Sequence, residues 1–496
     1  MKFISRFSLI LCLIVFRVSF SQGQFISTEH IFAADGYSVF EVGYPLKVAP
    51  GVEHKFVFME YWMAGKEKRR IENYYIESYG IRDYVEHWFQ PVTNEGFEPM
   101  QVTDLRRLEN VYAVIGLQYI QEEKEVHTVS RFFTLDGSSR TTEPVKISTY
   151  TKKPKKDYEE RIEISPRMKY MVWMGKIAEN YYFSVWDGSG NEVWKKELTI
   201  PYIQDKYQIK DLRIDDKGNL YFLMEPNVPV VFRKEKKPLI LLRYIQEKEE
   251  FMTEIVSTDG LSDVMDSHLA FLRNYDIIVA GVLSRDGATG ILNGANTGSE
   301  AVSRAWTHVF MKRYTREENN WHQLVLEADS ISPIPEKWVR HYQERGSDFT
   351  LSKIIPEDET AVVILEEHYM TKKKLYYYDL GCLGFNTRNG ALVWNEIVEK
   401  RQRDSQSNAF MSYVAGIARE RLRLVYLTER GASGQLLCTS IELGSGKRKD
   451  KMLASNEASN YLFFPSRSGM VSNFEMVLIG MGNPDQNDFK LITISF

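Results

Sequence analysis

The stretch Asp187-Gly188-Ser189-Gly190-Asn191-Glu192-Val193-Trp194 is the strongest indication of fold in this chain. It follows the aromatic-rich segment Tyr181–Trp186 and leads into Glu192–Ile200. Glycine adopts positive φ without steric cost, and Asp and Asn favour turns. The stretch therefore predicts a tight turn between two antiparallel strands.

The same turn is echoed later in the chain, at Asn389-Gly390-Ala391-Leu392-Val393-Trp394. Both copies read Gly-x-x-Val-Trp, and both follow a strand-like segment rich in aromatic residues. Self-similarity of this kind is the sequence signature of repeat architectures. The echo therefore predicts an array of repeated hairpins.

Strand-like segments separated by turn residues continue along the chain, with no helical periodicity longer than a few turns. The clearest unit starts at Arg161 and contains Tyr170–Met174, Tyr181–Trp186, the opening turn and Val193–Ile200. A second unit follows, with Leu212–Ile214, a turn at Asp215–Asn219, and then Leu220–Met224, Leu239–Tyr244 and Glu250–Val256. Such units recur roughly every 45–60 residues, a spacing typical of propeller blades. The sequence predicts an all-β fold, a β-propeller of about seven to eight four-stranded blades.

The two ends of the chain indicate how the propeller is closed. The last strand-like segment, Lys490–Phe496, runs to the final residue, and an unpaired one, Tyr37–Val48, lies near the start. Pairing the two in one blade would remove the edges that an open array leaves exposed. We therefore expect the N- and C-terminal strands to close the propeller.

The N-terminus has the features of a secretory signal peptide. Lys2 and Arg6 precede an apolar run, Phe7–Phe16, that is too short to span a bilayer. Small residues at Ser19 and Ser21 favour cleavage before the next residue.

This interpretation divides the chain into a signal peptide, residues 1–21, and a single β-propeller domain, residues 22–496. It also predicts an exported protein, located in the periplasm, at the cell surface or outside the cell. No later segment reaches about 18 uninterrupted apolar residues, so no transmembrane helix is expected in the mature chain.

Composition excludes some classes of function. The 496 residues are 43% hydrophobic and 26% charged, with a net charge of −4, an ordinary globular balance that gives no argument for nucleic-acid binding. Only Cys382 and Cys438 follow the signal segment, so a disulfide scaffold is excluded. We expect two buried thiols, with pairing between them as the alternative.

Three segments resemble those of known proteins. Ser165-Pro166-Arg167-Met168-Lys169-Tyr170 resembles the Ser-Pro-Asp-Gly-Lys-Tyr motif that opens blades in TolB-like propellers, with Arg-Met in place of Asp-Gly. The run Asp216–Phe222 resembles the turn that leads into a strand in other propellers. Tyr377–Asp404 is similar to a segment of uncharacterised secreted proteins from Bacteroidetes-type bacteria. The resemblance implies a secreted propeller and transfers no activity.

The sequence lacks recognisable signatures of catalysis, metal binding or cofactor binding. It contains no His-Glu-x-x-His, no Cys-x-x-Cys and no Gly-x-Ser-x-Gly. Glu366-Glu367-His368 could converge on an ion only if a bulge interrupted the strand, so we interpret it as polar surface at a strand end. Asp485 and Asp488 are interpreted as turn residues. We therefore predict no catalytic residue, no metal and no cofactor.

The tryptophans divide into two groups. Four are expected to pack in the core between blades: Trp173, Trp186, Trp194 and Trp394. Three lie beside polar loops and are candidates for a ligand or partner surface: Trp88, Trp306 and Trp321.

Three functions fit these observations. The first is a binding or interaction scaffold of the cell envelope, which uses the insertions Gly287–Ser299 and Gln343–Asp348 to hold a protein, peptide or glycan. The second is a carbohydrate-active or other hydrolytic propeller with carboxylates around its central channel. The third is an outer-membrane barrel, suggested by the alternating apolar residues of Ile492–Phe496.

Overall fold

The computed structural model describes most of the chain between residues 30 and 496. The described residues are 30–31, 42–52, 55–64, 70–80, 86–92, 100–120, 125–141, 143–150, 159–177, 180–227, 237–256, 262–285, 289–291, 302–304, 307–317, 320–335, 338, 348–370, 375–404, 412–428, 435–455, 462–481 and 489–496. The predicted signal segment lies outside them. No helix within these ranges is long and apolar enough to cross a membrane.

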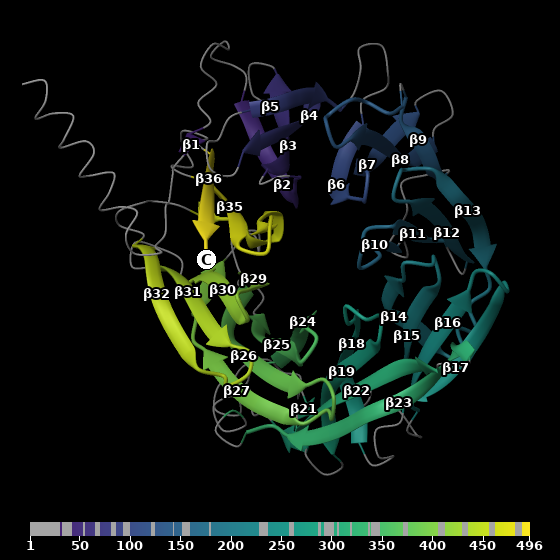
Figure 1. Ribbon diagram of the computed structural model, residues 1–496, viewed down its shortest axis with the longest axis vertical. Helices are drawn as coiled ribbons and strands as arrows, with labels where there is room; N and C mark the ends of the chain where they lie inside the picture. The colour runs from purple at the N-terminus through teal and green to yellow at the C-terminus, as the bar shows by residue number, and fades with distance from the viewer. Residues whose placement is uncertain are drawn as a thin grey trace, which may run out of the picture. The chain divides into compact units, whose positions relative to one another are not determined.

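The chain divides into two compact units. The larger, Thr93–Gln406 with Ile441–Arg448, contains five sheets (Figure 1). The first two are β6 (Met100–Arg107), β7 (Val111–Ile120), β8 (Glu125–Thr134) and β9 (Val145–Tyr150), then β10 (Glu159–Ile164), β11 (Tyr170–Ile177), β12 (Asn180–Asp187) and β13 (Glu192–Leu198). The third is β14 (Tyr207–Ile214), β15 (Leu220–Pro226), β16 (Leu239–Ile245) and β17 (Glu250–Val256). The fourth is β18 (Ser262–Phe271), β19 (Ile277–Arg285), β22 (His308–Glu317) and β23 (Asn320–Pro333). The fifth is β24 (Asp348–Pro356), β25 (Thr360–Met370), β26 (Leu375–Asn386) and β27 (Leu392–Val398), with β28 (Gln402–Asp404) beside β26.

The smaller unit, Met1–Val92 with Ser407–Ser440 and Lys449–Phe496, contains three sheets. One is β2 (Val42–Pro50), β3 (Lys55–Ala64), β4 (Arg70–Gly80) and β5 (Glu86–Pro91). Another is β29 (Tyr413–Ala418), β30 (Arg421–Leu427), β31 (Gln435–Glu442) and β32 (Arg448–Ser455). The last combines β1 (His30–Ile31), β33 (Leu462–Phe463), β34 (Gly469–Met470), β35 (Glu475–Met481) and β36 (Phe489–Ser495), with a 3-10 turn at η2 (Pro465–Arg467).

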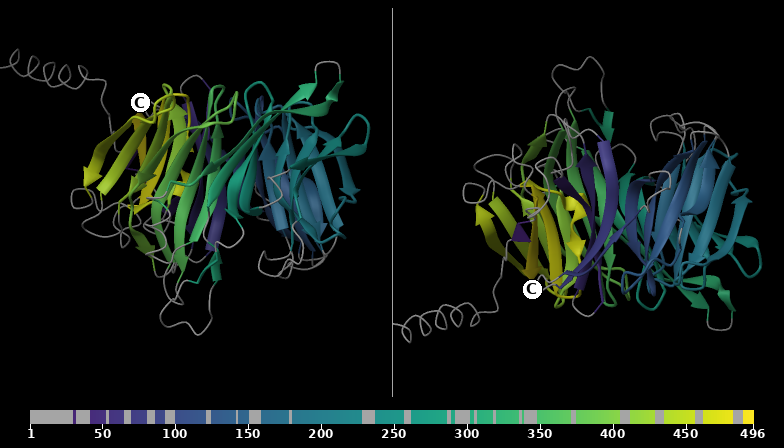
Figure 2. Two further views of the ribbon diagram at one scale, coloured as in Figure 1. Left: turned by 90° about the horizontal axis from the view of Figure 1, so that it is seen from below. Right: turned by 90° about the horizontal axis from the view of Figure 1, so that it is seen from above.

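The topology identifies the fold. Seven of these sheets take their main strands in chain order, each strand pairing with the next, and further views show the strands of a sheet lying side by side (Figure 2). In addition to the larger sheets, β20 (Thr289–Ile291) and β21 (Val302–Arg304) form a separate two-stranded sheet between β19 and β22 in the chain. Separate four-stranded meanders repeated along the chain define a propeller. The protein is an all-β propeller of about eight blades.

The last blade joins the two ends of the described chain, as predicted, but through a different strand. β36 pairs with β1, where His30 lies opposite Leu491, and with β35 on its other side. The predicted partner, Tyr37–Val48, instead overlaps β2, which pairs with β3 as the first strand of its own blade. A strand that already begins one meander is not available to complete another.

The prediction also missed the first strand of several blades. β6, β10, β24 and β29 were not expected as strands, and β10 begins at the end of the polar, lysine-rich segment 150–160. In contrast, all four strands of the unit Leu212–Val256 were predicted, although β14 begins earlier, at Tyr207.

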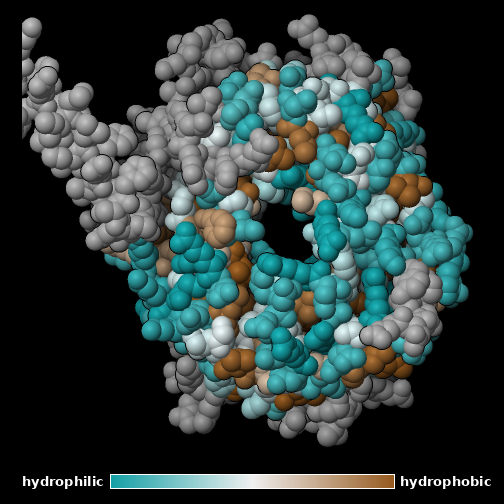
Figure 3. Space-filling view, in the orientation of Figure 1, coloured by the Kyte–Doolittle hydropathy of each residue, from teal (hydrophilic) through white to brown (hydrophobic). Residues whose placement is uncertain are grey.

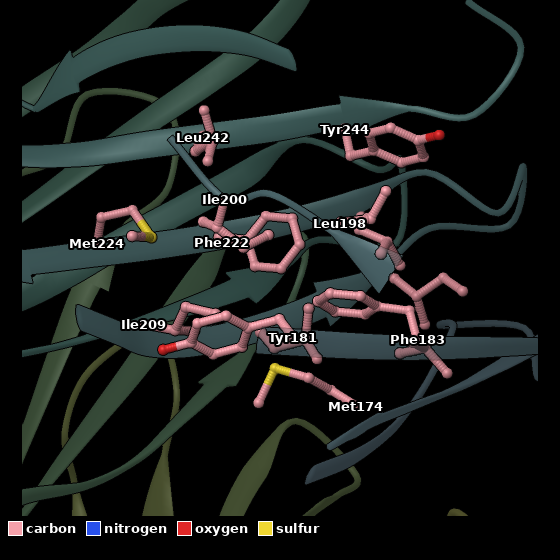
Figure 4. Packing of buried hydrophobic residues seen from close by; sticks show 14 of the residues in the cluster. Met174, Tyr181, Phe183, Leu198, Ile200, Ile209, Phe222, Met224, Leu242 and Tyr244 are labelled. Atoms are coloured by element: carbon pink, nitrogen blue, oxygen red, sulfur yellow. The ribbon is translucent and has the colours of Figure 1, made fainter. Parts of the chain in front are cut away.

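Adjacent blades of the larger unit pack through apolar side chains. Met174, Tyr181 and Phe183 from one sheet lie against Phe222 and Leu242 from the next (Figure 4). The four tryptophans assigned to the core confirm this packing. Trp173, Trp186 and Trp394 are buried, and Trp194 is partly buried against the cluster that contains Phe222. Cys382 and Cys438 are both free and buried, as expected, and burial raises the pKa of the two thiols to about 12 and about 11.

The turn at Asp187–Trp194 is a hairpin that its own side chains stabilise. The Asp187 carboxylate accepts hydrogen bonds from the backbone N–H groups of Ser189 and Asn191, each at 2.9 Å, and from Asn191 Nδ2 at 2.8 Å. Gly190 has φ +78°, and its counterpart Gly390 has φ +77°. Both turns therefore require glycine at the same position, which confirms the echo.

We expect Gly190→Ala to destabilise the protein by about 1–3 kcal/mol. The left-handed backbone disfavours a side chain there, and a Cβ would lie 2.8 Å from the Phe132 ring of the neighbouring blade. The urea midpoint should fall accordingly. Gly444→Ala is the matched control, because that glycine lacks a positive φ and has open space around it. Equal midpoints for the two variants would contradict the prediction.

Candidate functional site

Four of the five blades in the larger unit contain a bulge in their first strand. The register shifts after Val102 in β6, Ile209 in β14, Val264 in β18 and Leu351 in β24. A bulge adds one residue to a strand and turns the following side chains to the other face. The residue that directly follows the added one is Asp104, Asp211, Asp266 or Lys353.

Two of these aspartates link one blade to the next. The Asp211 carboxylate accepts the N–H of Leu212 and the N–H of Leu269 on β18, both at 2.9 Å. Asp266 repeats the arrangement: it accepts from its own neighbour at 3.0 Å and from Leu351 of β24 at 2.7 Å. Both carboxylates are buried. Their backbone contacts indicate a role in holding adjacent first strands together.

Charged side chains that reach solvent surround these two aspartates. We define the first-strand cluster as the following residues of β10, β14 and β18: Arg161, Glu163, Lys210, Asp211, Arg213, Asp266 and His268. β10 adjoins β14, and β14 adjoins β18. Much of the surface in the view of Figure 3 is hydrophilic. The charges of its members make the cluster a polar site assembled from three consecutive blades.

Arg213 joins the two acidic members of the cluster. Its Nη1 lies 3.1 Å from Glu163 Oε2 and 3.0 Å from Asp211 Oδ1, and its Nε donates to the Leu269 carbonyl at 3.1 Å. His268 Nδ1 lies 3.1 Å from Asp211 Oδ2. Because both carboxyl groups contact one guanidinium nitrogen, they lie within a few ångströms of each other.

The rest of the cluster is also paired across blades. Arg161 Nη1 and Nη2 donate to the carbonyls of Lys210 and Ile209 at 2.7 and 2.9 Å, which fixes the bulge of β14 against β10. Lys210 Nζ lies 2.7 Å from Asp266 Oδ1 on β18. These contacts hold the side chains in defined positions, as a recognition surface requires.

The two carboxyl groups beside Arg213 have pKa values that move in opposite directions. Burial raises the pKa of Glu163 above its ordinary value, with Arg213 opposing the shift. Burial also acts to raise the pKa of Asp211, but the hydrogen bond from His268 and the charge of Arg213 outweigh it, so this pKa is lowered. Glu163 is thus the member of the pair that takes up a proton more readily.

β24 replaces the bulge aspartate with a lysine. The side chain of Lys353 reaches solvent, yet desolvation by the protein around it lowers the pKa of its amine. β24 adjoins β18, so Lys353 extends the row of charged first-strand residues by one blade.

The structure does not test the tryptophan surface suggested by the sequence, because it describes the side chain of only one of the three residues. Trp88 lies on β5 and is half-buried. Trp321 belongs to β23, but its side chain lies outside the described residues, as does Trp306 entirely. The insertion Gly287–Ser299 is described only at β20, and Gln343–Asp348 only at its last residue. These candidates remain predictions.

One interpretation from sequence was wrong. Glu366 and Glu367 are buried, and do not form polar surface at a strand end. The register of β25 against β26 shifts between Glu366 and His368, but the extra residue belongs to β26, because Tyr378 and Asp379 lie opposite Glu367 alone. Among the described residues, no group of three or more His, Cys, Asp or Glu side chains is arranged to hold a metal ion. Asp485 and Asp488 lie outside them.

No family model and no curated protein matches this sequence. Among solved structures, the chain is similar to the Dos1 propeller, with 7% identity, a TM-score of 0.45, and coverage of 92% of this chain and 94% of that one. It is also similar to the polysaccharide lyase Uly1, with 8% identity, a TM-score of 0.41, and coverage of 95% and 100%. The propeller domain of the Trilobed protease from Pyrococcus furiosus matches with 12% identity, a TM-score of 0.36, and coverage of 81% and 94%. Likeness at this level supplies no argument about function.

Proposed function

We propose that this protein is an exported propeller that binds a protein, peptide or glycan in the cell envelope, and that the first-strand cluster forms part of the binding surface. The proposal rests on a difference between two groups of residues within the cluster. Backbone N–H groups occupy the buried Asp211 and Asp266, while Glu163, Arg213 and His268 keep side chains that are 32%, 28% and 29% exposed. A ligand can therefore contact the partly exposed side chains without displacing the backbone N–H groups from Asp211 and Asp266.

The ligand chemistry follows from these side chains. Arginine presents N–H donors in a fixed geometry that suits carboxylate or other planar acceptors. Glu163 and His268 add an acceptor and a group with both donor and acceptor capacity. The cluster therefore favours a ligand rich in hydroxyl, amide or carboxylate groups over an apolar one.

The test is binding to a panel of defined oligosaccharides and peptides immobilised on a surface. For any probe that the wild type binds, Glu163→Gln should weaken binding by about tenfold, which corresponds to about 1.4 kcal/mol. The fold should be retained, because burial raises the pKa of Glu163 and its ionised form gives the native state no large stabilisation. Glu249→Gln is the matched control, since Glu249 forms an exposed ion pair with Lys196 outside the cluster. If Glu163→Gln bound the probe as tightly as the wild type, the proposal that the first-strand cluster is the binding site would be refuted.

Export is supported by the charged N-terminus and the apolar run Phe7–Phe16. Expression of the full chain in its native type of host, followed by fractionation and N-terminal sequencing, should give an envelope or secreted protein that begins at Gln22. A cytoplasmic protein that retains Met1 would refute this part of the proposal.

A hydrolytic function is the second candidate. Two neighbouring carboxyl groups with pKa values pushed apart are the arrangement that acid–base chemistry uses. In this alternative Glu163 is the general acid, and Asp211 is the ionised partner. Asp211 has four hydrogen-bond or ion-pair partners, which leaves it poorly placed to attack a substrate. Release of reducing ends from a glycan by the wild type, but not by Glu163→Gln, would favour hydrolysis over binding.

A further inference from the structure

The fifth sheet of the larger unit buries a lysine among carboxyl groups. Lys400, in the segment that follows β27, is 1% exposed, and its neighbours Glu366, Glu367, Asp379 and Gln402 are buried as well. Lys400 Nζ donates to Glu366 Oε1 at 2.6 Å and to Gln402 Oε1 at 3.4 Å. The lysine amine and the Glu366 carboxyl group are thus in direct contact, shielded from solvent.

The surrounding structure fixes this contact from both sides. Glu366 pairs with Leu380 of β26, and the register then shifts because Tyr378 and Asp379 of β26 lie opposite the single residue Glu367. Asp379 Oδ1 accepts the backbone N–H of Lys400 at 3.0 Å, which anchors the segment that carries the amine. The Tyr377 ring lies 5.5 Å from Nζ and covers the site.

A buried ion pair is costly, because the desolvation of two charges offsets much of their attraction. Transfer of the proton from Nζ to a carboxylate converts the pair to a neutral amine and a neutral acid. Burial favours this direction by lowering the pKa of Lys400, although the charges of Glu366, Asp379 and Glu367 oppose it. A neutral amine is a nucleophile, and contact with an acid in fixed geometry replaces a bimolecular encounter.

We propose that Lys400 and Glu366 join in an intramolecular isopeptide bond. The neutral Nζ attacks Cδ of protonated Glu366, and a bond forms between nitrogen and carbon. The nitrogen then loses one proton, the hydroxyl group of Glu366 gains one, and the bond from Cδ to that oxygen breaks to release water. The product is a neutral secondary amide, and the step requires no oxidant, reductant or other reactant.

Asp379 is the group placed to move the proton. It contacts the backbone of Lys400, and its charge acts on the lysine amine more strongly than that of Glu367. It takes the proton that Nζ loses and delivers one to the leaving hydroxyl, so that its own protonation state is unchanged after the reaction. Condensation replaces two buried ionisable groups with one amide and ties β25 to the segment after β27.

The experiment is mass spectrometry of the purified full-length protein after complete unfolding. Relative to its sequence, the wild type should be lighter by one water molecule, and Lys400→Met should show no such deficit from the same N-terminus. Digestion of the wild type should yield a branched peptide that joins Glu366 to Lys400. This readout from the wild type remains decisive if the Lys400 variant fails to fold.

Two further variants sharpen the test. Glu366→Gln should give the same final mass as the cross-linked wild type, because ammonia replaces water as the leaving group and the product is identical. Lys312→Met removes another buried lysine, the partner of Asp329, and should keep the deficit. A wild-type chain of full sequence mass would overturn the proposal. A deficit of one ammonia, with Lys400 joined to Gln402, would overturn the assignment to Glu366.

Discussion

Asp211→Ala is expected to destabilise the protein by roughly 3–5 kcal/mol. The substitution removes the acceptor for the buried N–H groups of Leu212 and Leu269, and the second of these contacts joins β14 to β18. It also removes the carboxylate that contacts Arg213 and His268. The cost therefore combines unsatisfied buried donors with the loss of a link between blades, and a lower urea midpoint measures it.

The effect should depend on pH in a defined direction. The pKa of Asp211 is lowered from its ordinary value of 3.8 in the folded protein, so its ionisation stabilises the fold above that value. This contribution is lost as the pH falls through the folded pKa. The difference between wild type and variant should be full at neutral pH and shrink below about pH 4. Asp205→Ala, at an exposed loop position, is the control and should leave the midpoint unchanged. A difference that grows with acidity would contradict the argument.

Trp173→Ala should also cost about 3–5 kcal/mol, because a large side chain is removed from a closed core. Trp173 is fully buried on β11, within a cluster that includes Phe132 of the neighbouring sheet and Trp186. Gly175, two residues along the same strand, leaves room for the ring, since a Cβ there would collide with it. The thermal midpoint should therefore drop sharply.

Trp194→Ala is the matched control for this substitution. Trp194 lies on β13, the last strand of the same blade, and is only half-buried. Its ring is 5.9 Å from that of Tyr244, so some stability should be lost, but less than at Trp173. Comparable losses in the two variants would show that burial does not set the cost.

Sequence patterns located the strands made of apolar runs, such as β15 and β16, which are buried along nearly their whole length. The unit Leu212–Val256 was predicted strand by strand because its turn residues and apolar runs are clear. β10 reads Glu-Glu-Arg-Ile-Glu-Ile and was not expected as a strand. Its charged side chains contact the first strand of the next blade, as the hydrogen bonds of Arg161 show. Such residues resemble a loop in sequence because the strand faces water and other polar groups.

The candidate site was missed because its residues do not follow the regular pattern of a strand. Asp211 and Asp266 follow bulges, which break the two-residue period on which strand prediction depends. A signal was nevertheless present: an acidic residue precedes an apolar strand end, directly in Asp211-Leu212 and with two residues between in Asp266–Leu269. The approach of Glu163 to Asp211 through Arg213, and the contact of Lys210 with Asp266, depend on neighbouring blades and could not be predicted from spacing.

The burial of Glu366 and Glu367 shows the same limit. Alternation along a strand predicts that the two side chains lie on opposite faces, but it does not tell whether either face is buried. The lysine that approaches them, Lys400, lies beyond a hairpin and a further strand. Only the pairing of β25 with β26, together with the return of the chain after β27, brings amine and carboxyl group together.

The sequence by itself determined the architecture: turns at regular intervals, glycines where φ is positive, and aromatic strands whose apolar faces must be covered by a neighbouring blade. These properties are local, since each depends on residues close together in the chain. The tertiary structure decided where the chemistry lies. Hydrogen bonds such as that from Leu269 to Asp211, and the contact of Lys400 with Glu366, join residues far apart in sequence, because blade packing places them together.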